Sequence, residues 1–102
     1  MRKESKTIAQ AFLNREPARA KRTTTDGEEI LLFGNRIAWH TGHEIAVTLA
    51  GWGSVTTRDR LNTLFRLAGI DAGIFQRDHV QYISIGEETF PMDPDEIYFV
   101  KP

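Results

Sequence analysis

Apolar runs separated by short turn signals predict an antiparallel meander in the centre of the chain. Residues 30–33 and 37–39 are apolar and flank Gly34-Asn35. A loop of glycine and asparagine between two such runs is a strong hairpin signal, because both residues tolerate the positive φ that tight hairpin turns require. Thr41-Gly42 is a second turn signal, and residues 44–49 after it alternate between apolar and polar side chains. We therefore expect three short strands with one buried face.

An amphipathic helix follows this meander. Thr56 or Thr57 can cap its start, since a threonine hydroxyl accepts from the free N–H groups of a first helical turn. Gly69 is a natural stop. Between them, apolar residues recur at i, i+3, i+4 and i+7 as one stripe: Leu61, Leu64, Phe65 and Ala68. We expect this stripe to pack on the buried face of the meander.

The two ends of the chain add a first helix and further strands. Residues 3–15 have the periodicity of a helix, which Pro17 ends, and residues 18–25 form a linker or an irregular edge strand. After the second helix, alternation predicts strands at residues 74–75, 80–85 and 97–100. The sum is a single α+β domain over residues 1–102, with one antiparallel sheet of five or six strands and two helices packed on one face.

Composition narrows the class of protein. Apolar residues make up 40% of the chain and charged residues 26%, both ordinary for a soluble globular domain. There is no cysteine, which removes disulfides, thiolate metal sites and cysteine nucleophiles and fits a reducing cytoplasm. No apolar run approaches the length of a membrane-spanning helix, so we expect no contact with a membrane.

Charge is distributed unevenly, although the formal net charge is only −1. Residues 1–22 carry seven Lys or Arg and two Glu, a balance of +5, whereas residues 23–102 carry six Lys or Arg and twelve acids, a balance of −6. This asymmetry suggests a basic N-terminal helix and arm on an acidic body. Arg19, Lys21 and Arg22 are candidates for contact with nucleic acid or an acidic partner; the alternative is a solvated segment without a partner.

The loop into the second helix is a candidate site for a phosphate group. The loop contains glycines and hydroxyl side chains, including those of Thr56 and Thr57, and it leads into the start of the helix. Arg58 and Arg60 lie in the first turn of that helix. Free N–H groups, hydroxyls and arginines together can hold a phosphate. The alternative is that the threonines only cap the helix.

The second helix also carries a polar stripe. Arg58, Asn62 and Arg66 stand at i, i+4 and i+8, on a different side from the apolar stripe. A solvated helix face explains this spacing, and contact with nucleic acid or protein is the alternative.

Other chemistry has little support in the sequence. His40, His43 and Glu44 flank a predicted turn, whereas zinc proteases need two histidines at i and i+4 on a helix. No serine stands in a nucleophile motif, and Gly51-x-Gly53 lacks the third glycine of a dinucleotide-binding fingerprint. We therefore expect no enzyme activity, no metal and no cofactor.

Several of these motifs together resemble those of a family of small proteins encoded by bacteriophages and plasmids. The motifs are Ile8-Ala9-Gln10-Ala11-Phe12, Thr25-Asp26-Gly27, Gly34-Asn35-x-Ile37-Ala38 and Gly51-Trp52-x-x-x-Thr56-Thr57-x-x-x-Leu61-Asn62-x-Leu64. The resemblance covers nearly the whole chain. It implies a shared origin and fold, and it implies no particular chemistry.

These observations favour a small non-enzymatic binding protein of a bacteriophage or other mobile element. We expect it to occupy a host protein or complex in the cytoplasm of the bacterial host, as anti-defence proteins such as anti-CRISPR inhibitors do. One alternative is a nucleic-acid-binding accessory protein that uses the basic arm and the second-helix arginines. Another is a binder of a small phosphate-bearing ligand at residues 51–60, and a fourth is a structural domain that forms homodimers.

Overall fold

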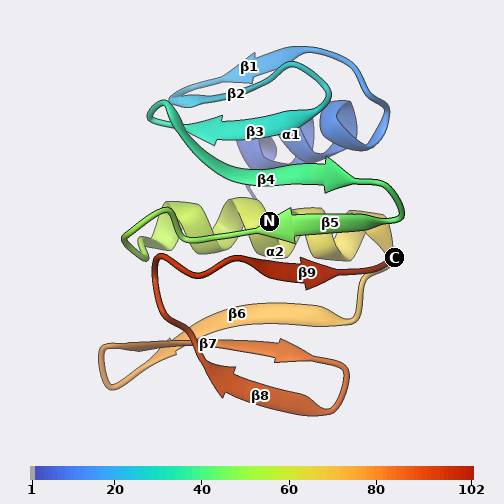
Figure 1. Ribbon diagram of the computed structural model, residues 1–102. Helices are drawn as coiled ribbons and strands as arrows, with labels where there is room; N and C mark the ends of the chain where they lie inside the picture. The colour runs from blue at the N-terminus through green and yellow to red at the C-terminus, as the bar shows by residue number, and fades with distance from the viewer. Residues whose placement is uncertain (1) are drawn as a thin grey trace.

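The computed structural model describes residues 2–102, which form two helices and nine strands (Figure 1). Both expected helices are present, residues 18–25 form two strands where a linker or an irregular edge strand was expected, and the strand at residues 88–91 was not expected. In chain order the elements are α1 (Lys3–Leu13), β1 (Ala18–Ala20), β2 (Thr23–Thr25), β3 (Glu29–Leu32), β4 (Asn35–Thr41), β5 (Glu44–Val47), α2 (Val55–Ala68), β6 (Ala72–Arg77), β7 (Val80–Ile85), β8 (Glu88–Pro91) and β9 (Tyr98–Val100).

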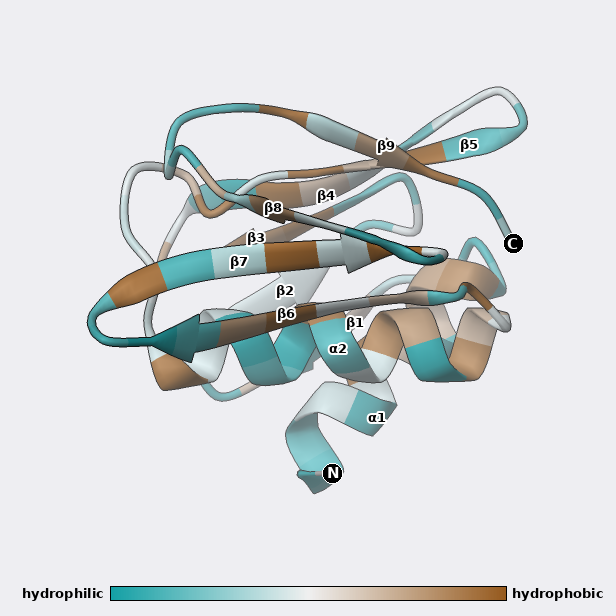
Figure 2. Cartoon of the chain, turned by 90° about the horizontal axis from the view of Figure 1, so that it is seen from below, coloured by the Kyte–Doolittle hydropathy of each residue, from teal (hydrophilic) through white to brown (hydrophobic). Residues whose placement is uncertain are grey.

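The strands form two antiparallel sheets, and both helices lie behind the larger one (Figure 1). The six-stranded sheet has the order β1-β2-β3-β4-β5-β9, so the last strand of the chain pairs with β5. The three-stranded sheet has the order β6-β7-β8, and its first strand lies against α2 (Figure 2). The fold is α+β, as predicted, but the prediction of a single sheet is wrong.

A side chain from α2 helps to explain why the second sheet stays separate. Asn62 donates from Nδ2 to the carbonyl oxygen of Ile74 at 2.8 Å, and its Oδ1 accepts from the Ile74 N–H at 2.7 Å. These two hydrogen bonds satisfy the outer edge of β6 where another strand would otherwise pair. Asn62, which the sequence placed in a polar contact stripe, therefore joins α2 to the second sheet.

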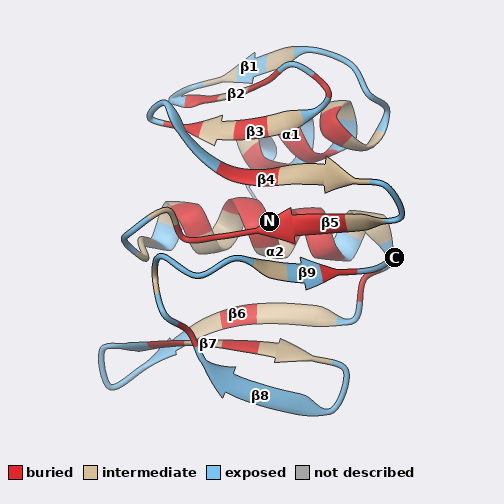
Figure 3. Cartoon of the chain, viewed as in Figure 1, coloured by how far each residue is buried: buried red, intermediate tan, exposed pale blue. Residues whose placement is uncertain are grey.

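The core lies between the six-stranded sheet and the helices (Figure 3). The predicted stripe of α2 is buried at its three larger residues, and Ala68 is only partly buried at its margin. Residues from both helices and both sheets meet in this core. Its largest fully buried side chains include Ile8, Phe12, Ile30, Ile37, Leu49, Leu61, Leu64, Phe65 and Ile83.

Strand β5 is buried on both faces, whereas the alternation predicted one. Ile45 and Val47 are buried in the core as expected, but Ala46 on the opposite face is fully buried as well. Ala46 pairs with Trp39 of β4 and with Phe99 of β9. These larger side chains flank the alanine methyl group on the face away from the helices, which we call the outer face.

Both turns of the meander lie one residue away from their predicted positions. The first is Phe33-Gly34 instead of Gly34-Asn35, and the second is Gly42-His43 instead of Thr41-Gly42. The Phe33 N–H donates to the carbonyl oxygen of Arg22 at 2.8 Å. This contact joins the first turn to the neighbouring hairpin, so the register depends on a tertiary interaction as well as on local turn preference.

The cap of α2 is Ser54, so the prediction of Thr56 or Thr57 is wrong. Ser54 has an extended backbone, and its hydroxyl accepts from the Thr57 N–H at 3.0 Å. Because the helix starts at Val55, Thr57 occupies the third helical position, where its own hydroxyl bonds to that of Ser54 at 2.9 Å.

The basic N-terminal segment packs against the rest of the fold: its helix is α1, and residues 18–25 form strands at the edge of the larger sheet. Helix α1 buries Ile8, Ala9 and Phe12, because its apolar side packs on α2 and on the six-stranded sheet. Residues 18–25 form the hairpin β1–β2, which pairs with β3 at the edge of that sheet. The basic residues of this segment are therefore held at defined positions.

Candidate functional site

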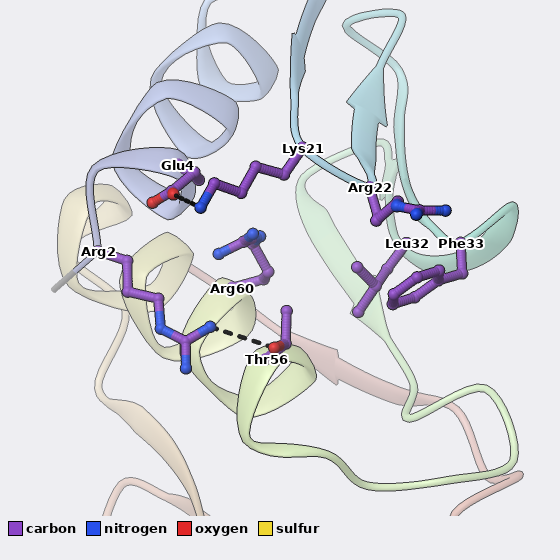
Figure 4. Close-up of a pocket in the computed structure, with 8 residues that line it drawn as sticks. All are labelled: Arg2, Glu4, Lys21, Arg22, Leu32, Phe33, Thr56 and Arg60. Carbon is purple, nitrogen blue, oxygen red and sulfur yellow. Dashed lines mark hydrogen bonds and ion pairs between the residues drawn. The ribbon is translucent and has the colours of Figure 1, made fainter.

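A pocket of about 270 Å³ lies where two hairpin turns meet the first turns of α1 and α2 (Figure 4). Four of its lining side chains are cationic and one is a carboxylate, so the pocket favours an anion. The lining residues are Arg2, Glu4, Lys21, Arg22, Leu32, Phe33, Thr56 and Arg60. We call this the basic pocket.

Arg60 is the anchor of the basic pocket. Its side chain is only 4% exposed. Nε donates to the Thr23 hydroxyl at 2.9 Å, and Nη1 donates to the Ser5 hydroxyl at 2.6 Å. Within residues 2–102 no hydrogen bond uses Nη2, and no fully buried side-chain nitrogen or oxygen lacks a partner. Arg60 lines the pocket, so Nη2, which has no hydrogen-bond partner among the described residues, is a candidate donor to a ligand there.

A buried polar network fixes the Arg60 guanidinium. The Ser5 hydroxyl, which accepts from Arg60, donates in turn to the Asp59 carboxylate. Burial lowers the pKa of the Arg60 guanidinium, and the charge of Asp59, 3.8 Å away, opposes this shift. An arginine remains protonated in proteins even so. The network joins α1, α2 and β2, and it holds a positive charge at the inner wall of the pocket.

Two further cations reach the pocket from its rim. The Lys21 ammonium lies 3.0 Å from the Glu4 carboxylate, and Arg2 Nη1 donates to the Thr56 hydroxyl at 3.1 Å. A hydrogen bond from its own backbone N–H, and then the Lys21 ammonium, lower the pKa of the Glu4 carboxyl. Glu4 is consequently ionised at neutral pH and offsets part of the positive charge.

The two turns at the pocket hold non-glycine residues in the left-handed region. Lys21 has φ +55° and Phe33 has φ +53°. Such a backbone is uncommon for any residue with a side chain and is an outlier for a bulky one. Phe33 is also 55% exposed, and the Arg22 guanidinium lies 5.7 Å from its ring centroid. Backbone strain of this kind is concentrated at functional sites in proteins.

The structure brings three of the sequence-predicted site residues together in the basic pocket and separates the others. Lys21, Arg22 and Thr56 line the pocket. Arg19 lies on the outer face of β1, beside Asp26 and Glu29 rather than beside the other cations. The positive charges of the N-terminal segment therefore do not form one continuous strip.

The remaining predicted residues, all on α2, largely serve the fold. Thr57 and Asn62 make the internal hydrogen bonds described above. Arg58 Nη1 donates to the side-chain oxygens of Gln76 at 3.1 Å and Gln81 at 3.0 Å, which links α2 to β6 and β7. Arg66 is exposed near the end of the helix. The polar stripe is thus mostly engaged within the protein.

Sequence reasoning missed Arg2, Glu4 and Phe33, and it grouped Arg60 with Arg58 in a loop site. A signal for Arg60 was available, because it precedes Leu64 by one helical turn and so lies beside the buried stripe. A buried arginine needs polar partners. No local pattern indicates that these partners come from α1 and β2.

Of the two histidines near the second turn, His40 has a structural role. His40 stacks on Phe12 of α1 with ring centroids 4.0 Å apart, and its Nε2 lies 3.0 Å from the Phe12 carbonyl oxygen. His43 lies exposed in the second turn. Among residues 2–102, no three histidine or carboxylate side chains gather as a metal site, and neither helix has the length and apolar character to cross a membrane.

Comparison with known proteins gives one match. The family model described as "Kyanoviridae Gp96 protein" matches residues 1–101. The match spans nearly the whole chain and confirms, at this level, the resemblance to phage proteins seen in the sequence. No curated protein and no solved structure matches the chain.

Proposed function

We propose that this chain, which belongs to the Kyanoviridae Gp96 family of phage proteins, is a non-enzymatic binding protein that holds a phosphate-bearing ligand in the basic pocket. It would act in the cytoplasm of the bacterial host. The observation that carries the proposal is the buried Arg60, which lines the pocket and whose Nη2 has no hydrogen-bond partner among residues 2–102. A guanidinium presents its N–H groups in a planar fork that matches phosphate oxygens.

The surroundings of Arg60 support an anionic ligand. Arg2 and Lys21 place two more charges at the same pocket, so a phosphate group would contact cations from three separate segments of the chain. The pocket also lies at the first turns of both helices, where the helix dipoles favour negative charge. Burial of Arg60 has a free-energy cost that binding of an anion offsets in part.

The chemical character of the lining supports binding rather than catalysis. Glu4, the carboxylate that lines the pocket, is paired with Lys21 and is ionised, so it is a poor general acid and a weak base. The Thr56 hydroxyl accepts from Arg2, and within the described residues no histidine lines this pocket to activate it.

Opposite charge changes at the rim give the first test. Lys21→Asn is expected to weaken binding of inorganic pyrophosphate about tenfold, and Glu4→Gln to strengthen it about threefold. Asparagine tolerates the positive φ of Lys21, so the turn should keep its shape. Isothermal titration calorimetry at low ionic strength measures both effects.

Arg77→Gln is the matched control for Lys21→Asn, because it removes one positive charge from β6, away from the pocket. We expect it to change the affinity little. Equal weakening by the two substitutions would mean that only net charge matters, and this result would contradict the assigned site.

A second candidate function, binding to a host protein or complex as an anti-defence inhibitor, is favoured by the outer face. There the Arg36 guanidinium lies 3.8 Å from the Trp39 ring centroid, and Phe99 is 53% exposed. Arginine and aromatic side chains are enriched at the centres of protein interfaces.

Affinity purification of the tagged protein from a bacterial host, with and without nuclease, tests this second function. A stoichiometric host protein is expected to survive nuclease, and Phe99→Ser is expected to release it. Phe90→Ser is the control, since Phe90 is an exposed phenylalanine of β8. Recovery of nucleic acid alone, lost at high salt, would instead favour the nucleic-acid alternative.

A further inference from the structure

We infer that the basic pocket recognises a nucleotide unit, with the phosphate at Arg60 and the base against Phe33. This inference rests on the proposed function, because it adds a base to the proposed phosphate site. The recognised chemistry is a nucleoside 5′-phosphate, whether free or at the 5′ end of a strand.

The pocket has a charged side and a second side with two apolar side chains. Figure 4 shows the ends of Arg2, Lys21 and Arg60 on one side, and Leu32 and Phe33 on the other, with Arg22 beside them. A phosphate alone would use only the charged side. A ligand with a phosphate at one end and a flat apolar ring at the other would use both sides.

Phe33 has the properties of a stacking platform. Phe33 is 55% exposed although the neighbouring Leu32 is buried. The Arg22 guanidinium, 5.7 Å from the ring centroid, adds a planar cation beside it. Aromatic rings and arginine planes are the groups on which proteins stack nucleobases, and such stacking tolerates any base because every base has a π-face.

The backbone at Phe33 indicates that the fold alone does not explain this aromatic residue. Phe33 has φ +53° in a two-residue turn, where asparagine or glycine would carry less strain. The adjacent Gly34, with φ +79°, follows the usual preference. A strained and exposed aromatic residue at the rim of a cationic pocket is what a binding role for the ring predicts.

The size of the pocket limits the ligand. Its volume of about 270 Å³ lies just below the range for small-molecule sites, which begins at roughly 300 Å³. We therefore expect one nucleotide unit to occupy the pocket, with any further nucleotides of a strand outside it.

The test compares three ligands that add one chemical part at a time. Inorganic phosphate, ribose 5-phosphate and adenosine 5′-monophosphate are titrated into the native protein and into Phe33→Asn. The native protein is expected to bind the nucleotide about tenfold more tightly than ribose 5-phosphate, and Phe33→Asn is expected to remove this difference. The melting temperature of Phe33→Asn should equal or exceed that of the native protein, because asparagine relieves strain in the turn.

A control variant and a pair of oligonucleotides complete the experiment. Phe90→Asn removes an exposed phenylalanine from β8 and should leave all three affinities unchanged. A 5′-phosphorylated oligonucleotide and its 5′-hydroxyl counterpart separate the two sources of the ligand. Preference for the phosphorylated strand over the free nucleotide assigns the site to strand ends, and the reverse assigns it to free nucleotides.

The outcomes separate this inference from the proposed function. Equal binding of ribose 5-phosphate and the nucleotide by the native protein would overturn the base platform and leave the phosphate site intact. Failure of all three ligands to bind would overturn the proposed function itself. A lower melting temperature with equal losses for all three ligands would also overturn the inference, because Phe33 would then only shape the turn.

Discussion

Gly27→Ala is expected to destabilise the protein by about 3 kcal/mol or more. A β-carbon at this position would lie 2.5 Å from the carbonyl carbon of Arg15 and 2.8 Å from the nitrogen of Glu16. Both are backbone atoms, so no side-chain rotation relieves the overlap. Gly27 also has φ +96°, a conformation that side-chain-bearing residues rarely adopt.

Hydrogen bonds within the turn around Gly27 fix its position against the backbone of Arg15 and Glu16. The Asp26 carboxylate accepts from the N–H groups of Glu28 at 2.8 Å and Glu29 at 3.0 Å, and these bonds lower the pKa of Asp26. The Thr25 hydroxyl accepts from the Gly27 N–H at 3.0 Å. The Thr25-Asp26-Gly27 motif therefore closes the turn between β2 and β3. The turn packs against the backbone of Arg15 and Glu16, which follow α1.

Thermal and urea unfolding measure the effect of Gly27→Ala. For a domain of about 100 residues, a loss of 3 kcal/mol lowers the melting temperature by roughly 12 °C or more. Gly34→Ala is the matched control: Gly34 has φ +79°, but its added β-carbon would meet nothing within 4 Å. We expect it to cost about 1 kcal/mol. Equal losses for the two variants would show that backbone strain alone, and not the contact with Arg15, makes Gly27 necessary.

Arg60→Met is expected to weaken binding of inorganic pyrophosphate about 100-fold, which corresponds to about 3 kcal/mol. Methionine fills a similar volume but removes the fixed donor at the inner wall of the pocket. The loss should exceed that of Lys21→Asn, because the Lys21 side chain is 73% exposed whereas that of Arg60 is 4% exposed. A charge screened by water contributes less to affinity than a desolvated one.

The controls for Arg60→Met separate binding from folding. Arg66→Met makes the same replacement on an exposed site of the same helix, and it should leave affinity and stability nearly unchanged. Melting temperature is measured for each variant, because Arg60→Met also leaves Ser5 and Thr23 without a donor. Arg60→Lys keeps the charge, and we expect it to fold and to bind with lower affinity. Unchanged affinity in folded Arg60→Met would contradict the assignment of the pocket.

The helices show which features of the fold are local. The spacing of Leu61, Leu64 and Phe65 indicates a buried stripe because helical periodicity is a property of neighbouring residues. The cap was misplaced, because Ser54, Thr56 and Thr57 all have suitable hydroxyls and only the path of the preceding loop selects one. The first hairpin turn was displaced for a similar reason, since the bond from Phe33 to Arg22 comes from another hairpin.

The two sheets show where local reasoning ends. Alternation predicted most of the strands, but alternation does not say which strand edge pairs with which. Asn62 engages the edge of β6 at Ile74, and β9 pairs with β5 across an intervening helix and sheet. Both contacts join residues that are distant in sequence or belong to different elements, and a single sheet was the simplest arrangement without them.

The sequence by itself determined the α+β class, the two helices, most of the strands and the resemblance to phage proteins, because periodicity and turn chemistry depend on nearby residues. Only the tertiary structure decided that Lys21, Arg22 and Thr56 share a pocket with Arg2 and Arg60, while Arg58 and Asn62 are engaged by the second sheet. A pocket forms where chain segments meet, and the charges of all these segments together set its electrostatic potential. The physical reason is that side-chain direction and burial, which convert a basic residue into a site, are set by packing between elements.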